Sequence, residues 1–348
     1  MKNLIGVAVL GAAVIWGATV GPAAAQEVKW KMGSAFGSKV TQLGTLGLNL
    51  SNTVKAVSGG QFDLKFYEPK ALAGTKEYFD AIAAGSIDAA YTTAGYYQGK
   101  EPALALFSAV PFGPSAGEYM AWIFHGGGHD VYDKIYAAHG LKGLICGVIA
   151  PEASGWFKKE IKSVADLKGL KMRFFGLGAK VMQNLGVETQ LLAGGDIFPA
   201  LERGTIDAAE FSMPAIDLAK GFYQAGAKHY YFPGWHQQAT LFELLMNKKK
   251  WEGLSDQNKA ILQTSCKANL TDGLSEGEAI QGSALVTLKS KGVQIHTWSP
   301  EILAKLQETW NSVAAGIASK DANFKTTWDS LQAFRAEYKI WKNLGYLK

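Results

Sequence analysis

The feature that most constrains the fold is an internal repeat of one helix–turn–strand unit. Residues 79–91 read FDAIAAGSIDAAY and residues 198–210 read FPALERGTIDAAE. Each copy joins a short helical stretch, a Gly-Ser or Gly-Thr turn, and an Ile-Asp-Ala-Ala run that enters a buried strand. Gly85 and Gly204 fit the left-handed residue that closes a helix. Two ordered copies of one unit indicate two lobes of similar construction.

The sequence around the repeats predicts strands that alternate with helices. Strands are expected at Val28–Ser34, Phe62–Phe66, Gly143–Ala150 and Leu170–Phe175, with a helix around Val40–Val57. This alternation predicts an α/β fold with parallel-type sheets, whose ligands bind beyond the carboxyl ends of the strands. Helical patterns dominate the last quarter of the chain.

The first residues predict export. Lys2 precedes an apolar run from Leu4 to Val20, and a small-residue Ala-Ala-Ala stretch ends at Ala25. This order is typical of a secretory signal peptide cleaved after Ala25, and an uncleaved membrane anchor is the alternative. Cleavage removes 25 residues and one positive charge, so the formal net charge falls from +5 to +4. Such a mild surplus does not indicate nucleic-acid binding.

The chain has two cysteines, Cys146 and Cys266. An oxidising compartment permits a disulfide, but the sequence does not place the two Cα atoms within bridging distance. The pairing therefore stays open, and the absence of a CxxC spacing gives no zinc signal.

The C-terminal segment predicts an amphipathic helix with a broad aromatic stripe. The apolar residues recur at spacings of four and three: Phe324, Trp328, Leu331, Phe334, Tyr338 and Trp341. Two interpretations remain, a helix packed on its own chain and a helix that reaches onto a second subunit.

An arginine within an apolar strand is the first candidate for a binding residue. In KMRFFGLGAK, Arg173 precedes a Gly-x-Gly turn and a helix. A buried arginine needs a partner, and a ligand carboxylate matches its planar fork in a bidentate way. An ion pair with a neighbouring acid is the alternative. A dinucleotide fingerprint is excluded because Val181 stands where the third glycine is required.

Two glutamates are candidate metal ligands. Glu210 ends the second repeat copy and therefore lies at the ligand-facing end of its strand, and Glu152 precedes an Ala-Ser-Gly-Trp stretch. Two acids in one cleft either share a cation or repel each other. The alternative is a pair of unrelated surface glutamates.

An enzymatic function is not expected. His125-Gly-Gly-Gly resembles an esterase oxyanion loop, and Gly-Leu-Ser275-Glu-Gly matches the nucleophile-elbow pattern. That elbow requires a strand before the serine, whereas Ser275 lies in a long helical stretch. The only later histidine is His296, and no Walker loop, HExxH or paired-histidine spacing occurs.

Several runs together resemble the solute-binding proteins of TRAP transporters, in the branch that binds 2-oxo and 2-hydroxy acids. They are VKWKMGSAFG, AIAAGSIDAAY, SGWFKKEIKSVADLKGLKMRFFGLGAKVMQNLG and GGDIFPALERGTIDAAEFSMP. The resemblance covers nearly the whole mature chain. It implies a two-lobed periplasmic protein with a hinged cleft and a long connecting helix. It also implies a small organic acid as ligand and a sodium-driven TRAP permease as membrane partner.

The resemblance assigns roles to particular residues. Arg173 holds the substrate carboxylate, and a cation is bound by the Glu210 side chain and the Phe211 carbonyl. Glu152 stands where relatives carry a glutamine, and two carboxylates favour Ca²⁺ over Na⁺ as the bound cation, with Na⁺ and direct binding without metal left open. Tyr96 or Tyr97 forms an aromatic wall.

The remaining expectations concern Glu243, the domains and the partners. Glu243, in TLFELLMN, is a further candidate to face the cleft. We expect lobe I at 26–148 and about 235–295, lobe II at 149–234, and C-terminal helices at 296–348 that form a homodimer by helix exchange. A periplasmic ligand sensor for a membrane receptor is the alternative function.

Overall fold

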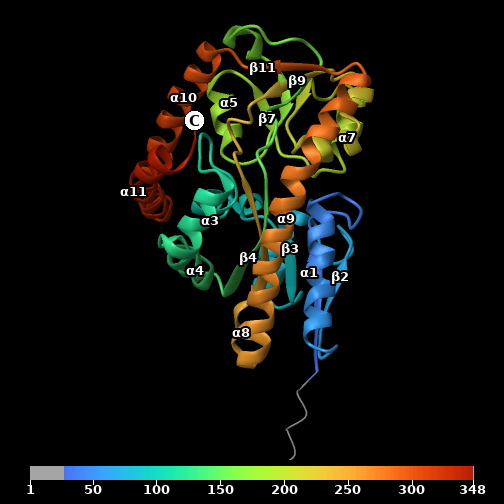
Figure 1. The fold of residues 1–348 in the computed structure, drawn as a ribbon, viewed down its shortest axis with the longest axis vertical. Coiled ribbons are helices and arrows are strands. Elements are labelled where there is room, and N and C mark those ends of the chain that lie inside the picture. The colour runs from blue at the N-terminus through green and yellow to red at the C-terminus, as the bar shows by residue number, and fades with distance from the viewer. Residues whose placement is uncertain (1–26, 348) are drawn as a thin grey trace, which may run out of the picture.

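A computed structural model describes residues 27–347, and in it the strands form two separate sheets. The predicted signal peptide at 1–25 and the anchor alternative lie outside the described residues. The first sheet has the order β2-β1-β3-β10-β4 and the second the order β11-β9-β5-β8-β6-β7. Figure 1 shows the two sheets at opposite ends of an elongated molecule, with helices packed around each. No helix within 27–347 is long and apolar enough to cross a membrane.

The strands and helices alternate along most of the chain. The strands are β1 (Val28–Ser34), β2 (Phe62–Tyr67), β3 (Ala89–Thr92), β4 (Leu141–Ile149), β5 (Gly155–Phe157), β6 (Lys171–Arg173), β7 (Glu188–Gln190), β8 (Ala208–Ala209), β9 (His229–Phe232), β10 (Thr240–Asn247) and β11 (Gln294–Thr297). The α-helices are α1 (Leu43–Val57), α2 (Tyr78–Ala83), α3 (Ala116–His125), α4 (Gly128–Ala138), α5 (Gly178–Asn184), α6 (Ile197–Glu202), α7 (Pro214–Lys220), α8 (Lys248–Glu252), α9 (Asp256–Ser290), α10 (Pro300–Ala318) and α11 (Ala322–Gly345). The short strand β11 lies within the last quarter of the chain, where the sequence predicted mainly helices.

The internal repeat folds as two equivalent units, one in each sheet. In the first unit α2 leads to β3, and in the second α6 leads to β8. Gly85 and Gly204 close these two helices with φ of 77° and 72°, the left-handed conformation that glycine adopts without strain. Because β3 pairs parallel with β1 and β8 pairs parallel with β6, the two repeats enter their sheets in the same sense.

Each sheet also contains an antiparallel strand. β10 pairs antiparallel with β3 and β4, and β5 pairs antiparallel with β8 and β9. Residues 150–154 cross from the first sheet and lead into β5, and residues 233–239 cross back and lead into β10. Both sheets are therefore mixed, because β5 and β10 run opposite to the repeat strands β8 and β3.

The long helix α9 packs against both halves of the molecule (Figure 1). It contacts β4 and α1 on one side and α7 on the other. A Cβ atom on Gly273 would lie 2.8 Å from the carbonyl oxygen of Val148, so a glycine is needed for this close approach. A disulfide between Cys146 in β4 and Cys266 in α9 adds a covalent link, which answers the question that the sequence left open.

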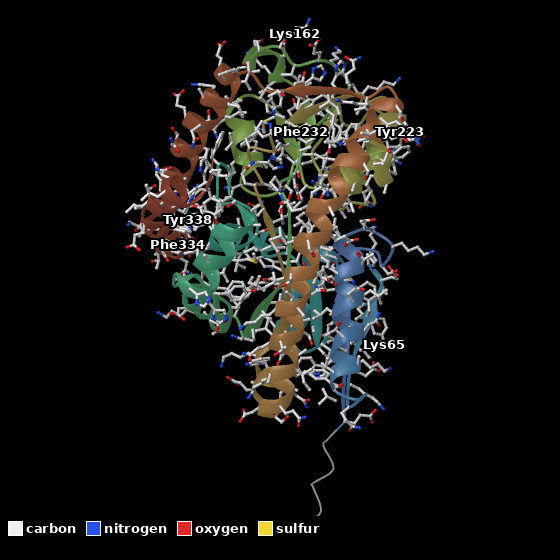
Figure 2. All side chains as sticks on the ribbon, viewed as in Figure 1. Lys65, Lys162, Tyr223, Phe232, Phe334 and Tyr338 are labelled. Carbon is white, nitrogen blue, oxygen red and sulfur yellow. A yellow bond between two sulfur atoms is a disulfide. The ribbon has the colours of Figure 1, made fainter. Side chains whose placement is uncertain are left out.

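The C-terminal stripe forms a helix, as predicted, and its first half packs on its own chain. Phe324 and Leu331 are fully buried. Arg335 donates from Nε to Glu118 Oε1 at 2.9 Å and from Nη1 to the carbonyl of Phe112 at 3.0 Å. Figure 2 shows Phe334 and Tyr338 on this helix. The second half and the residues that follow it are open to solvent, and their large apolar side chains are exposed: Ile340, Trp341, Leu344, Tyr346 and Leu347.

Candidate functional site

The centre of the candidate site is a buried ion pair between Arg173 and Glu210. Arg173 ends β6, and Glu210 follows β8, whose residue Ala209 is in register with Arg173. The two side chains therefore meet at the carboxyl ends of neighbouring parallel strands. Arg173 Nη1 donates to Glu210 Oε2 at 2.9 Å and to the Glu210 carbonyl at 2.5 Å. Both side chains are almost completely buried. The alternative for Arg173, an ion pair with a neighbouring acid, is thus present in the structure.

The guanidinium keeps donor capacity for a ligand. Arg173 Nε donates to the carbonyl of Leu192 at 3.2 Å, and Nη2 has no hydrogen-bond partner among residues 27–347. The guanidinium also lies over the ring of Phe211, 5.4 Å from its centroid. Arg173 is therefore positioned firmly while Nη2 stays available to a carboxylate.

Glu152 brings a second carboxylate to the same place. It lies in the segment that connects β4 to β5, and its backbone N–H donates to the carbonyl of Gln237 in the segment that returns from β9 to β10. Glu152, Glu210 and His236 each present a ligating atom within 4.8 Å of the others, and all three are buried. The two crossing segments therefore contribute directly to the site.

Several polar atoms of this group have no hydrogen-bond partner within the described part of the chain. They are Glu152 Oε2, Glu210 Oε1, Gln237 Oε1 and both ring nitrogens of His236. Buried polar atoms are normally paired, so an unpaired cluster indicates a ligand or an ion. Because the atoms that converge are mainly oxygens, the donor set fits a hard cation such as Ca²⁺ or Na⁺.

The two carboxyl groups have opposite electrostatic environments. Burial, followed by the charges of Glu210 and Asp217, raises the pKa of Glu152 well above its usual range. Burial alone would also raise the pKa of Glu210, but the Arg173 guanidinium and His236 outweigh it and hold that pKa below its usual value. In the absence of a cation Glu210 is therefore ionised, and Glu152 favours its protonated form.

A small cavity of about 30 Å³ lies beside these groups. Side chains from both sheets line it. They are Phe36, Leu43, Thr93, Tyr96, Glu152, Arg173, Phe175, Phe211, Ser212, Gln237, Thr240 and Phe242. The Tyr96 ring meets Phe175 edge to face at 5.1 Å, and burial raises the pKa of the Tyr96 hydroxyl. The cavity is thus lined by aromatic rings, by the Arg173 guanidinium and by the Glu152 carboxyl group, a combination that suits a small anion.

The structure brings Arg173, Glu210, Glu152, Phe211 and Tyr96 together, but not Tyr97 and Glu243. The Tyr97 hydroxyl donates to Thr92 Oγ1 at 3.1 Å, away from the cavity.

Glu243 lies on the far side of β10. Thr240 and Phe242 line the cavity, whereas Glu243, after an irregularity in the strand, turns to the opposite face. There it accepts hydrogen bonds from the hydroxyls of Tyr132 at 2.5 Å and Tyr136 at 2.8 Å. Burial raises the pKa of Glu243 to about 7.

Among the residues with unpaired polar atoms at the site, sequence reasoning missed His236 and Gln237. Both lie in the irregular segment between β9 and β10, where no period marks a buried face. The one usable signal is the GWHQQAT run, which places polar side chains between two apolar strands.

The esterase-like motifs do not form a site. Ser275 lies inside α9, and its hydroxyl donates to the carbonyl of Thr271 at 2.8 Å. His125 is exposed in the last turn of α3. The strand-to-helix elbow that a nucleophilic serine requires is therefore missing around Ser275.

Known proteins are similar to this chain in sequence and fold. Residues 32–321 match bacterial extracellular solute-binding protein family 7. A monocarboxylate 2-oxoacid-binding periplasmic protein of Nostoc is 37% identical over 324 residues, which cover 92% of this chain and 88% of that protein.

Two solved structures of TRAP transporter solute-binding proteins superpose closely. One, from Bordetella bronchiseptica, is a mixed-occupancy dimer with copurified calcium and picolinate in one site. It has a TM-score of 0.90 and 29% identity, and the match covers 92% of this chain and 95% of that one. The other, from Pseudoalteromonas atlantica, has bound sodium and pyruvate. Its TM-score is 0.88 with 28% identity, over 92% and 97% of the two chains.

Proposed function

The chain belongs to family 7 of the bacterial extracellular solute-binding proteins, and we propose that it captures a 2-oxo or 2-hydroxy monocarboxylate together with a Ca²⁺ ion. Proteins of this kind are ligand-binding components of transporters and not enzymes. As a TRAP solute-binding protein, the chain delivers a small organic acid to a sodium-driven membrane permease.

The observation that carries the proposal is the convergence of unpartnered buried oxygens beside Arg173. Glu152 Oε2, Glu210 Oε1 and Gln237 Oε1 accept no hydrogen bond within the described chain, and the nearest charged contact of Glu210 Oε1 is His236 Nε2 at 3.5 Å. Glu152, Gln237 and Arg173 line one cavity. Together with the Phe211 carbonyl, these oxygens would hold the cation. The cation supplies positive charge to which the ligand's carboxylate and 2-oxygen bind, while Arg173 Nη2 donates to the carboxylate.

The ligands of the relatives share one chemical feature. Pyruvate carries a carbonyl oxygen next to its carboxylate, and picolinate carries a ring nitrogen in the corresponding position. Each presents two acceptor atoms that can chelate one ion. This common feature supports chelation in the present site, and the small cavity favours a short ligand.

The charge balance supports Ca²⁺ over Na⁺. Glu152, Glu210 and the ligand carboxylate carry three negative charges when ionised, and Arg173 balances one of them. A divalent ion neutralises the remaining two, whereas a monovalent ion leaves one buried charge uncompensated.

The proposal includes location and assembly. Signal-peptide cleavage places the mature chain in the periplasm. The cleft lies between lobe I (26–148 and about 235–295) and lobe II (149–234), and closure of the lobes excludes water from the ligand. The exposed half of α11 supports a homodimer, since it leaves Trp341 and Leu344 open to a second subunit.

Ligand titration after exhaustive chelation tests the proposal. Protein is unfolded and refolded to remove retained ligand and then titrated with pyruvate by calorimetry, in sodium-free buffer with a chelator. The same titration follows after Ca²⁺ or Na⁺ is added back separately. We expect binding to require Ca²⁺. Restoration by Na⁺ alone would contradict the choice of ion, and undiminished affinity without either ion would contradict the metal bridge.

A further inference from the structure

A second cluster of metal-binding side chains lies outside the cleft, at one edge of the second sheet. His229 begins β9 and His296 lies in the edge strand β11. The strands are parallel, with His229 opposite Gln294 and His296 opposite Tyr231. Since side chains two residues apart share a face of a sheet, His229, Tyr231 and His296 project from the same face.

The two imidazoles approach each other closely. His229 Nδ1 and His296 Nε2 share a hydrogen bond of 3.0 Å, and the ring centroids are 5.2 Å apart with an interplanar angle of 28°. A bound ion would replace the shared proton. Two nitrogens bound to one ion at about 2.1 Å and at right angles would be about 3 Å apart. The spacing therefore suits two neighbouring positions of one coordination sphere.

Stacked aromatic rings fix the position of His296. The Tyr231 ring stacks on His296 at 4.6 Å and on Trp298 at 4.2 Å. The Tyr231 hydroxyl accepts a hydrogen bond from the Ile161 N–H at 2.7 Å and donates to the Ile161 carbonyl at 3.2 Å. His296 thus rests on a ring that is itself fixed, which lowers the cost of ordering the ligands around an ion.

Solvent can reach both rings. Both histidines are half-buried, so an ion from solvent can reach them. Water would complete the coordination of an ion held by the two imidazoles.

We propose that His229 and His296 form a second metal site, selective for divalent transition ions such as Cu²⁺, Ni²⁺ or Zn²⁺. Imidazole nitrogens favour these ions, whereas Ca²⁺ and Na⁺ bind oxygen. The site is therefore chemically distinct from the oxygen-rich cleft. A bound ion clips the edge strand β11 to β9 and stabilises that end of the molecule. This proposal does not depend on the ligand of the cleft.

Titration of the mature chain without an affinity tag tests the site. Calorimetry with CuCl₂, NiCl₂ and ZnCl₂ is run on protein saturated with CaCl₂ and pyruvate, so that the cleft is filled. We expect one ion per chain and, at about 100 times the dissociation constant, a Tm rise of about 3–5 °C. Electron paramagnetic resonance of the Cu²⁺ form should show two nitrogen ligands, a readout that needs no variant.

Three variants locate the ion. His296→Gln should weaken Cu²⁺ binding at least tenfold and leave pyruvate affinity unchanged. The matched control His125→Gln changes an exposed histidine on α3 and should bind Cu²⁺ like the parent. No binding by the parent chain, or unchanged binding by His296→Gln, would overturn the proposal. Loss of binding in His236→Gln instead would place the ion in the cleft and overturn it as well.

Discussion

Replacing Glu152 by glutamine should have opposite effects on the ligand-free protein and on Ca²⁺ binding. The ligating oxygens of Glu152 and Glu210 lie within 4.8 Å of each other. At an effective dielectric constant of about 20, two ionised carboxylates at this distance repel by about 3 kcal/mol. Protonation of Glu152 relieves part of this repulsion, so the substitution should stabilise the ligand-free protein by about 1–3 kcal/mol near pH 8.

The same change removes a negatively charged ligand of the cation. We expect Ca²⁺ affinity to fall at least a hundredfold, which corresponds to about 2.7 kcal/mol. Binding with Na⁺ should be retained, because glutamine still offers a neutral oxygen. Because Glu152 must lose its proton to bind the ion, Ca²⁺ affinity of the parent should also rise with pH, and this dependence should weaken in Glu152→Gln.

Both effects are measured on protein from which a chelator has removed metal ions. Thermal unfolding gives the stability, and calorimetry gives the affinity after Ca²⁺ or Na⁺ is added back. The matched control is Glu243→Gln, which neutralises an equally buried carboxyl outside the cavity. It should leave Ca²⁺ affinity unchanged. A Glu152→Gln protein that binds Ca²⁺ as tightly as the parent would refute the assignment of Glu152 to the cation.

Three further outcomes are expected. Arg173→Lys keeps the charge but loses the planar fork, so calorimetry should show pyruvate affinity at least tenfold weaker, and binding within twofold of the parent would contradict the anchor role. Burial raises the pKa of Glu243 from 4.5 to about 7, so the folded state binds the extra proton and stability decreases as pH rises between these values. Glu243→Gln should flatten that part of the Tm–pH profile, and an unchanged slope would contradict the shift. Truncation after Ala336 keeps the packed half of α11 and should give a monomer by light scattering, whereas a persistent dimer would place the interface elsewhere.

The repeat and the strand ends were predictable because short-range patterns determine them. An Ile-Asp-Ala-Ala run after a glycine turn specifies where a strand ends, and that position puts Glu210 beside Arg173. The same reasoning could not find His236 or Gln237. Their place depends on two chain crossings that run side by side, a property of the tertiary fold.

The alternation of side chains along a strand explains why Glu243, predicted to face the cleft, lies on the other side of β10. Glu243 follows Phe242, a cavity residue, and adjacent strand residues face opposite sides. The apolar sequence of β10 gives no sign of which side is the cleft, because both faces of this strand are buried. Similarly, the even stripe of α11 did not reveal that only its first half packs on its own chain.

The attachment of α9 at two points has a mechanical consequence. The disulfide at Cys266 fixes this helix to β4 of the first sheet. Farther along, Gln281 Oε1 accepts a hydrogen bond from the Ala215 N–H of α7, beside the second sheet. The two anchors are about 22 Å apart along the helix axis. In the proposed opening of the lobes, the helix would have to bend between the anchors or lose the Gln281 hydrogen bond. The stiffness of this one helix would then contribute to the energy difference between the closed and open forms, at a distance from any residue that touches the ligand.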